Sequence, residues 1–317
     1  MKKKVSNGMK VLFAAQDPGG RNAIMPVILA LKSEGAEVGT DVAEPDIFIA
    51  GTSAGDSLDK QIMRTLGVTP SLYVLDFWLN YWQRFSSAGK KDFAFLPTRI
   101  CVMDEIAKKE MIAEGFPTER LIVTGNPHFD HFADAVERKG EEERILFVSQ
   151  PLSSLAAMPG FSAAACDEYA AIGNILDVLR TLPPKYYLSL RLHPKEPKGK
   201  YKEYLEPRVR RADEPTLEEA LSKSGLIIGM SSPVLIQAAA AGKKVLSYEP
   251  ELLGNDPLVS NRVGVTTRIE SKEALADALV AYAIGKWDFK TRSLREVWPK
   301  GATERVVEVV HALVAKK

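Results

Sequence analysis

The stretch LIIGMSSPVLIQAAAAGKKV, residues 226–245, decides how the chain is expected to fold. Its apolar run at 226–228 predicts a buried strand, a tight turn follows, and residues 233–241 have the composition of a helix. Ser232 is a natural N-cap residue, with Pro233 at the first helical position. A second strand is predicted at 244–247. A strand, a helix and another strand in this order are typical of a parallel sheet.

The same alternation continues on both sides of this stretch. Further strands are predicted at 10–15, 47–50, 72–75, 100–102, 121–124, 145–149 and 187–192. Helices are predicted at 22–32, 56–66, 106–114, 167–182 and 216–222, with Gly35, Gly67 and Gly115 as stop signals after the first three. We therefore predict an α/β protein of two Rossmann-like, doubly wound parallel-sheet domains that face each other across a cleft.

A charged stretch without apolar periodicity, residues 136–144, is predicted to be a linker or a frayed helix end between the two halves. We expect residues 1–138 to form the first domain and residues 144–301 the second. The last stretch, 302–317, carries apolar residues at helical spacing and should pack along a domain as a helix: Val306, Val307, Val310 and Leu313.

Composition narrows the function classes. The 317 residues include 42 Lys and Arg against 41 Asp and Glu, so no basic field attracts nucleic acid, and no nucleic acid partner is expected. Cys101 and Cys166 are too few for a thiolate zinc site and are predicted to be buried small apolar side chains. The apolar runs are too short for a signal peptide or a membrane span, which indicates a cytoplasmic protein. The lysine-rich start leaves open a peripheral contact with an anionic membrane surface.

The first candidate for chemistry is Asp17-Pro-Gly-Gly-Arg-Asn22, which directly follows the first predicted strand. Gly19 and Gly20 would let the backbone approach a ligand, and Arg21 lies beside them at a helix start that favours anions. The dinucleotide fingerprint Gly-x-Gly-x-x-Gly is absent, so a nicotinamide cofactor is not expected. Asp17 would act as a general base on an acceptor hydroxyl, or would only end the strand in an Asp-Pro turn.

Two further candidates follow strands in the second half. Strand alternation places Arg191 and His193 on one face, near the carboxyl edge of the sheet. His193 would donate to a phosphate oxygen or give a proton to a leaving group, or else would be a surface histidine with a local partner. Gly229 and the hydroxyls of Ser231 and Ser232 stand at a positive helix end, which predicts a phosphate or pyrophosphate cradle.

Two loops carry additional polar candidates. Asn126 and His128 lie in the turn-rich segment 124–130, which would contribute to the site or serve as a structural hinge. Glu249 and Glu251 follow the strand after the Ser-Ser helix. They would accept ribose or sugar hydroxyls, or lie in an ordinary solvated loop.

An aromatic stretch, 77–85, is predicted to be helical, with Asp76 before it and Arg84 within it. It would line an acceptor pocket, contact a membrane interface or pack in the core between domains. Asp76 and Arg84 are candidate polar groups on the acceptor side. Asp104 begins the next helix, where a capping role suffices to explain it.

The chain resembles the GT-B glycosyltransferase superfamily, and within it the branch of bacterial sialyl- and polysialyltransferases and the glycerophosphotransferases of teichoic acid synthesis. His193-Pro194 is similar to the His-Pro motif of that branch, and Ser231-Ser232 to its serine-rich helix start; both are implied to hold the nucleotide phosphates. Residues 123–127 with Asp130 resemble the segment that leads into the second domain there and in the UDP-N-acetylglucosamine 2-epimerases. Asp17 falls in the loop where inverting members often keep their base.

The chain also departs from those patterns. Residues 149–152, Ser-Gln-Pro-Leu, stand where the epimerases have His-Arg-x-Glu-Asn. The Glu-x7-Glu pair of retaining enzymes does not start in the Glu249 loop, and an acidic pair followed by Gly, as in polysialyltransferases, is not evident. In the resembled fold, the helix predicted at 302–317 crosses back to the first domain.

The resemblance implies an inverting enzyme of cell-envelope polysaccharide synthesis that needs neither a metal nor another cofactor. It would transfer a sugar or polyol phosphate from a nucleotide-activated donor to a hydroxyl of a glycan or lipid-linked acceptor. The second domain would bind the donor and the first the acceptor, with Asp17 as base and His193 at the phosphates. Two alternatives stay open: a nucleotide-sugar epimerase or hydrolase of the same fold, and a binding subunit that has lost catalysis. The sequence specifies neither the donor nor the oligomeric state.

Overall fold

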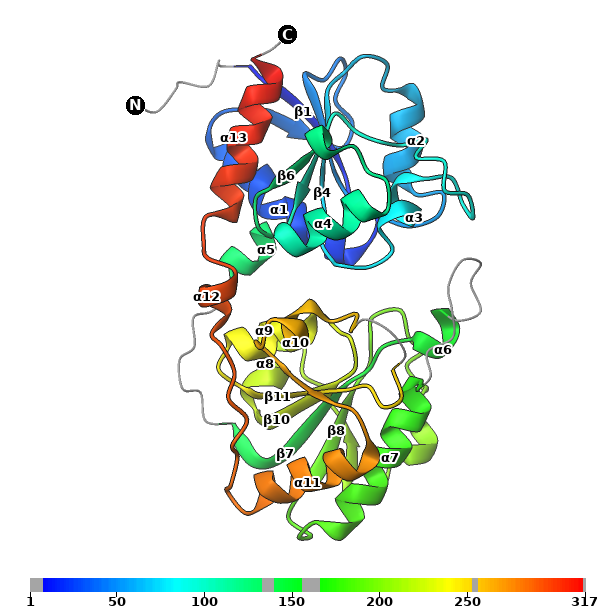
Figure 1. Ribbon diagram of the computed structural model, residues 1–317, viewed down its shortest axis with the longest axis vertical. Coiled ribbons are helices and arrows are strands. Elements are labelled where there is room, and N and C mark those ends of the chain that lie inside the picture. The colour runs from blue at the N-terminus through cyan, green and yellow to red at the C-terminus, as the bar shows by residue number, and fades with distance from the viewer. Residues whose placement is uncertain (1–7, 133–139, 156–165, 253–255, 316–317) are drawn as a thin grey trace. The chain divides into compact units, whose positions relative to one another are not determined.

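The chain divides into two compact units in the computed structural model, which describes residues 8–132, 140–155, 166–252 and 256–315 (Figure 1). One unit comprises the chain up to His131 together with the segment from Trp298 on; the other is Phe132–Val297. Each contains a six-stranded sheet in which all paired strands run parallel. The prediction of two Rossmann-like, doubly wound domains is therefore confirmed.

In the first unit the strand order is β2-β1-β3-β4-β5-β6. The strands are β1 (Lys10–Ala14), β2 (Glu37–Gly39), β3 (Ile47–Gly51), β4 (Ser71–Val74), β5 (Arg99–Val102) and β6 (Leu121–Val123). The helices are α1 (Pro18–Ser33), α2 (Leu58–Thr65), α3 (Tyr81–Phe85), α4 (Glu105–Ala113), η1 (Thr118–Arg120), α5 (Pro127–Asp130) and α13 (Ala302–Val314).

In the second unit the strand order is β12-β11-β10-β7-β8-β9. The strands are β7 (Glu141–Val148), β8 (Tyr187–Arg191), β9 (Val209–Arg211), β10 (Ser224–Gly229), β11 (Lys244–Tyr248) and β12 (Thr267–Ile269). The helices are α6 (Leu152–Leu155), α7 (Glu168–Thr181), η2 (Lys202–Tyr204), α8 (Leu217–Ser222), α9 (Val234–Ala240), α10 (Val259–Arg262), α11 (Lys272–Ala283) and α12 (Leu294–Val297).

Glycines end the first three predicted helices as expected. Gly35, Gly67 and Gly115 have φ angles of 92°, 63° and 100°, a left-handed conformation that a residue without Cβ adopts at little cost. Each lies just beyond the end of α1, α2 or α4. The stop signals in the sequence are therefore confirmed.

The C-terminal helix α13 packs on the first unit, beside α1 in Figure 1. Its apolar residues Val306, Val307, Val310 and Leu313 join α1 and strands β1, β3 and β4 in one core. Asp130 fixes the start of the helix, because its carboxylate accepts from the backbone N–H groups of Gly301 and Thr303 at 3.0 and 2.8 Å. Residues at the last positions of the chain thus complete the first sheet's core.

In the second unit α7 and α11 cover one face of the sheet, and their apolar residues form a single core with β7, β8, β10 and β11. Helices α8 and α9 lie on the other face (Figure 1). Both predicted buried cysteines, Cys101 and Cys166, are buried thiols. Of the helices that the structure describes, none has the length and apolar character to cross a membrane.

The prediction for the charged stretch 136–144 is wrong in its second part. Residues from Glu141 on belong to β7, and 136–139 lie outside the described residues. The strand extends into charged sequence because Arg144 forms a buried two-pronged ion pair with Glu214, at 2.6 and 3.0 Å. A contact between residues 70 positions apart leaves no trace in local periodicity.

The predicted helix over 77–85 is also wrong in its first half. Only Tyr81–Phe85 is helical, because Asn80 adopts a left-handed conformation with φ at 57°. Trp78 packs instead against Trp298, with 5.2 Å between the ring centroids. Trp78, Tyr81 and Phe85 are buried, so core packing explains these three aromatic side chains.

Asp104 does more than cap a helix. It accepts from the backbone N–H of Ala107 at 2.8 Å, as a capping residue should. Its carboxylate also accepts from the indole N–H groups of Trp78 at 3.0 Å and Trp298 at 2.9 Å. The cap therefore also ties the C-terminal segment to the first sheet.

Candidate functional site

In the first unit the polar candidates lie where the strands end. Asp76, after β4, accepts at Oδ1 from the Thr52 hydroxyl at 2.9 Å and from Arg84 Nη1 at 2.7 Å. The same Arg84 nitrogen also donates to the Thr52 hydroxyl at 2.7 Å. The Asp76 and Arg84 side chains are only 14% and 13% exposed, so solvent screens their ion pair weakly. This triad joins the ends of β3 and β4 to α3.

The glycine loop after β1 lies directly on this triad. A Cβ on Gly19 would stand 2.2 Å from Asp76 Oδ2, and one on Gly20 would stand 3.1 Å from the backbone nitrogen of Thr52. Glycine is required at both positions for this close approach. Helix α1 consequently begins at Pro18, four residues before the predicted start, with proline at the first helical position.

The remaining first-unit candidates take different places. Asp17 occupies the N-cap position of α1 without a side-chain capping bond, and its carbonyl accepts from Arg21 N at 2.9 Å. Arg21 itself is exposed. Asn126 donates to the Asp76 carbonyl at 3.4 Å and accepts from the backbone N–H of His128 at 3.0 Å. The structure therefore gathers Gly19, Gly20, Asp76, Arg84 and Asn126, with Asp17 at the start of the same loop.

In the second unit the Ser-Ser turn is buried at the end of β10. Ser231 and Ser232 are 8% and 5% exposed, and the Ser232 hydroxyl accepts from Val234 N at 3.3 Å. Helix α9 starts at Val234, one residue later than predicted. Gly229 has a packing role, since a Cβ there would stand 2.7 Å from a methyl group of Val148.

Glu249, at the end of β11, is a buried carboxyl group beside this turn. Among the described residues its Oε2 has no hydrogen-bond partner. Burial, together with the nearby Asp256 carboxylate, raises the pKa of Glu249 to about 7, and the Ser231 hydroxyl and Arg268 oppose that shift. Glu251, two residues on, is exposed and left-handed, with φ at 59°. The two predicted sugar-binding carboxylates thus differ fully in environment.

His193 stands at the end of β8 as predicted, half-buried. Lys195 N donates to its Nδ1 at 3.2 Å, and its own backbone N–H donates to Glu196 Oε2 at 2.7 Å. Burial lowers the pKa of His193 below the usual value, Lys195 and Lys200 act in the same direction, and Glu196 opposes them. Arg191 is directed elsewhere, donating from Nη1 to the Glu214 carbonyl at 3.1 Å.

Strand β7 separates the histidine from the serine turn. Because β7 lies between β8 and β10, two interstrand spacings, or about 10 Å, separate the ends of those strands. Ser149 and Gln150 follow β7 and lie between them in the strand order. Gln150 Oε1 is buried and, like Glu249 Oε2, has no partner in the described part of the chain. Two unoccupied acceptors therefore flank the serine turn.

Several of these groups were not predicted from the sequence. Thr52 directly follows a buried strand as Gly-Thr-Ser, a signal of the same kind as the other strand-end loops. Gln150 also follows a predicted strand. Glu196 and Lys200 show only an i, i+4 spacing after the His-Pro pair, which is too common to indicate a site.

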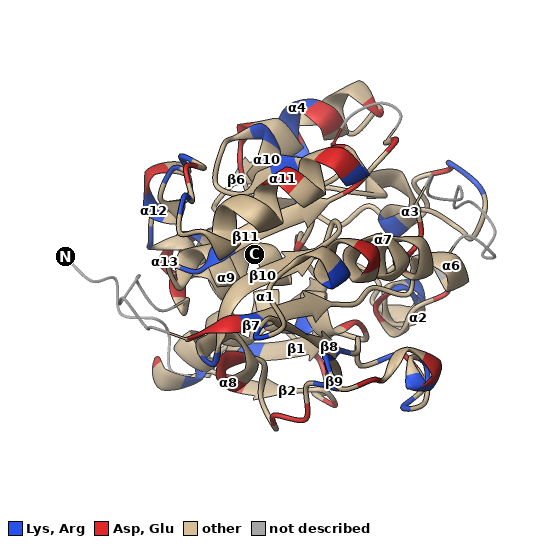
Figure 2. Ribbon diagram, turned by 90° about the horizontal axis from the view of Figure 1, so that it is seen from below, with Lys and Arg blue, Asp and Glu red and all other residues tan. Residues whose placement is uncertain are grey.

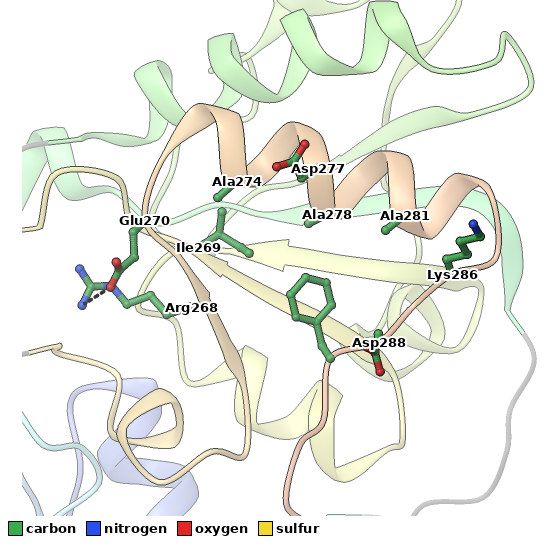
Figure 3. Close-up of a pocket in the computed structure, with 10 residues that line it drawn as sticks. Arg268, Ile269, Glu270, Ala274, Asp277, Ala278, Ala281, Lys286 and Asp288 are labelled. Carbon is green, nitrogen blue, oxygen red and sulfur yellow. Dashed lines mark ion pairs between the residues drawn. The ribbon is translucent and has the colours of Figure 1, made fainter.

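A pocket of about 530 Å³ lies elsewhere in the second unit, between α11 and the segment that follows it (Figure 3). Figure 3 shows Ala274, Asp277, Ala278 and Ala281 along α11, with Lys286 and Asp288 on the segment beyond. The predicted site residues do not line it. Basic and acidic residues are interspersed on the helices of both units, in keeping with a net charge of +1 (Figure 2).

No protein-family model and no curated protein matches the chain. Solved structures do: the S. aureus MnaA–UDP co-structure has 14% identity over 97% of each chain, with a TM-score of 0.63. The UDP-GlcNAc 2-epimerase of Methanocaldococcus jannaschii, in complex with UDP-GlcNAc and UDP, has 13% identity over 96% of this chain and 100% of that one, with a TM-score of 0.62. The glycotransferase of kitacinnamycin has 14% identity over 97% of this chain and 99% of that one, with a TM-score of 0.55.

The chain has the GT-B fold. The predicted fold class is thereby confirmed. The GT-B structures it matches include both epimerases and glycosyltransferases, so the likeness does not select one branch of that fold. At these identities the GT-B likeness concerns the fold, and the activity must be argued from the site.

Proposed function

We propose that this chain is a GT-B-type glycosyltransferase that transfers a sugar or polyol phosphate from a nucleotide-activated donor to a hydroxyl acceptor, with inversion and without a metal. The observation that carries the proposal is the buried Glu249 carboxyl group, whose Oε2 has no partner among the described residues, beside the Ser231–Ser232 turn. A nucleotide presents phosphate oxygens, which accept hydrogen bonds, and ribose hydroxyls, which can donate them. This edge of the sheet offers both donors and acceptors.

The serine turn supplies donors, which suit phosphate oxygens. The hydroxyls of Ser231 and Ser232, both buried at the end of β10, can donate to an anion. Glu249 and Gln150 supply acceptors, which suit ribose hydroxyls and not phosphate. A buried carboxylate oxygen without a partner costs free energy, and a bound hydroxyl would remove that cost.

The first unit supplies groups for the acceptor. Asp17 stands at the loop after β1 and would deprotonate the attacking hydroxyl. Arg84 and Thr52 occupy one oxygen of Asp76, so that carboxylate would orient the acceptor and not take its proton. His193, which follows β8 and is half-buried, would meet the charge on the leaving group as a hydrogen-bond donor.

The comparisons also favour a second candidate, a nucleotide-sugar epimerase, since several matched structures are UDP-GlcNAc 2-epimerases. The residues after β7, Ser149-Gln150-Pro151, differ from the histidine pattern expected of those enzymes. The two candidates separate in one assay. An epimerase converts the free nucleotide sugar without an acceptor, whereas a transferase needs one.

The test measures the binding of UDP, CDP and CMP to the native chain and to Glu249→Gln. Thermal shift and calorimetry are the two readouts. A ligand at 100 times its Kd should stabilise the chain by about 2.7 kcal/mol. Glu249→Gln should weaken the best nucleotide about tenfold or more, the scale of a hydrogen bond to a charged group. Glu270→Gln is the matched control, because that carboxylate follows the neighbouring strand β12 but is 70% exposed.

The pH dependence of nucleotide affinity gives a second test of Glu249. A ribose hydroxyl favours the ionised carboxyl group, so affinity should rise with pH through about 7, the pKa of Glu249. That rise should be absent in Glu249→Gln. Asp17→Asn should abolish transfer and leave nucleotide affinity nearly intact. If the native chain binds no nucleotide at millimolar concentration, the proposal fails.

A further inference from the structure

His193 lies in a turn in which two hydrogen bonds join it to Glu196. Its carbonyl accepts from Glu196 N at 2.9 Å, and its N–H donates to Glu196 Oε2 at 2.7 Å. Within the turn, Lys195 N donates to the ring at Nδ1, at 3.2 Å. A backbone N–H can only donate, so Nδ1 must accept, and the neutral ring carries its proton on Nε2.

The carboxylate of Glu196 is itself held by further hydrogen bonds. The residue is 8% exposed, and its second oxygen, Oε1, accepts from the Ser149 hydroxyl at 2.8 Å and from Lys200 Nζ at 2.6 Å. Ser149 directly follows β7, the strand that pairs with β8. The carboxylate therefore joins the His193 turn to the neighbouring strand.

Lys200 continues this network to α7. Its ammonium group also bonds the Glu168 carboxylate, and it lies 4.9 and 5.3 Å from the ring centroids of Tyr169 and Tyr201. Glu168 accepts in addition from the backbone N–H and the hydroxyl of Ser153, at 2.9 and 2.6 Å. The Lys200, Glu196 and Glu168 side chains are 5%, 1% and 0% exposed.

Such a buried network costs desolvation free energy, so its value lies more in fixing a geometry than in stability. We propose that Glu196 is a positioning residue that sets the tautomer of His193, so that the ring presents Nε2–H as a donor to an anionic oxygen. The assignment of the tautomer depends only on the hydrogen bonds of the turn. That the oxygen belongs to a donor phosphate rests on the proposed function.

The electrostatics make the tautomer matter. The charged groups that act on the ring are Glu196, Lys195 and Lys200, and burial together with the two lysines lowers the pKa of His193. The ring is therefore mainly neutral at neutral pH and has one ring proton to place. With that proton on Nδ1, the lone pair of Nε2 would face the anion and repel it.

Ring nitrogen shifts from long-range ¹H–¹⁵N NMR test this directly, because the chain has only four histidines and His193→Asn assigns the signal. In the native chain we expect two widely separated signals, a protonated Nε2 and an accepting Nδ1. In Glu196→Ala the turn loses its acceptor, and the two signals should move toward each other as tautomers mix. Glu196→Gln keeps one acceptor oxygen and should show a smaller change in the same direction.

Glu214→Gln is the matched control, because it breaks the buried ion pair with Arg144 on the same sheet and keeps the backbone carbonyl that accepts from Arg191. It should cost stability and leave the His193 signals unchanged. Signals unchanged in folded Glu196→Ala overturn the proposal. If that variant does not fold, unchanged signals in folded Glu196→Gln overturn it equally.

Nucleotide affinity separates this inference from the proposed function. If both hold, UDP or the best nucleotide should bind Glu196→Ala about tenfold more weakly, the cost of one misdirected hydrogen bond to an anion. If the native chain binds no nucleotide but the ring signals respond to Glu196→Ala, the positioning role stands and the phosphate role fails. Tenfold weaker binding with unchanged ring signals would assign Glu196 another role and overturn the proposal.

Discussion

Asp59 is a fully buried carboxyl group in the first turn of α2. Burial is the largest cause that raises its pKa, and the Ser57 and Tyr73 hydroxyls and Lys60 oppose it. Because the folded-state pKa lies above the unfolded value, the fold binds more protons between the two. The free energy of unfolding therefore falls as the pH rises through that window.

We expect Asp59→Asn to remove this pH penalty. At pH 8 the variant should be more stable than the native chain by about 1 kcal/mol or more, the scale of an unfavourable buried polar group. Near pH 2.5, below the usual pKa of an aspartic acid, the carboxyl group of the native chain is protonated in both the folded and the unfolded state, so the gain should vanish. Urea unfolding at the two pH values measures both. Asp56→Asn, whose side chain is 58% exposed, should show no such gain, and an equal gain there would refute the explanation.

At the scale of elements, local pattern predicted most strands, and the exceptions have identifiable causes. The edge strands β2, β9 and β12 were not predicted, because each has three residues and at least one of them is charged, whereas β6, equally short, is the apolar run Leu-Ile-Val. The charged start of β7 is stabilised by the Arg144–Glu214 ion pair, a contact that only the folded chain creates. Tertiary contacts of this kind override local propensity.

The sequence predicted the loops of the candidate site but not the environment of each side chain in them. The loops after β1, β8, β10 and β11 follow from the rule that parallel strands present ligands at their carboxyl ends. Inside those loops the sequence does not show which side chains are buried, so Glu249 and Glu251 were equivalent until the structure separated them. The Lys200 network could not be predicted for a related reason, because Glu168 lies 32 residues before Lys200 in the sequence.

Helix α13 gives a prediction at this scale. Asp130 accepts from the N–H groups of Gly301 and Thr303 and from the Thr303 hydroxyl, so Asp130→Ala leaves the first turn of α13 without its cap. The loss should be about 0.5–2 kcal/mol, confined to the first unit. Hydrogen exchange should show faster exchange in α13 and β1, with α11 unchanged. Ser271→Ala, which removes the cap of α11, should give the converse pattern.

At the scale of the whole molecule, the two units differ in how the chain closes them. The second unit is one continuous segment, Phe132–Val297, with its own core. The first unit depends on residues from both ends of the chain, because Trp298 and α13 complete it. An incomplete chain therefore affects the two units unequally.

A chain that ends at Val297 should keep the second unit folded and lose the first. Truncation removes buried Val306, Val307 and Val310, together with the Trp298 bond to Asp104. At about 1.5–3 kcal/mol for each buried aliphatic side chain, the loss is comparable to a domain's whole stability of about 5–15 kcal/mol. Hydrogen exchange should show β1, β3 and β4 unprotected, with β7 and β10 protected as in the full chain. A peptide of residues 298–317 added in trans should restore protection to the first sheet, and protection without the peptide would show that the first unit folds without its C-terminal helix.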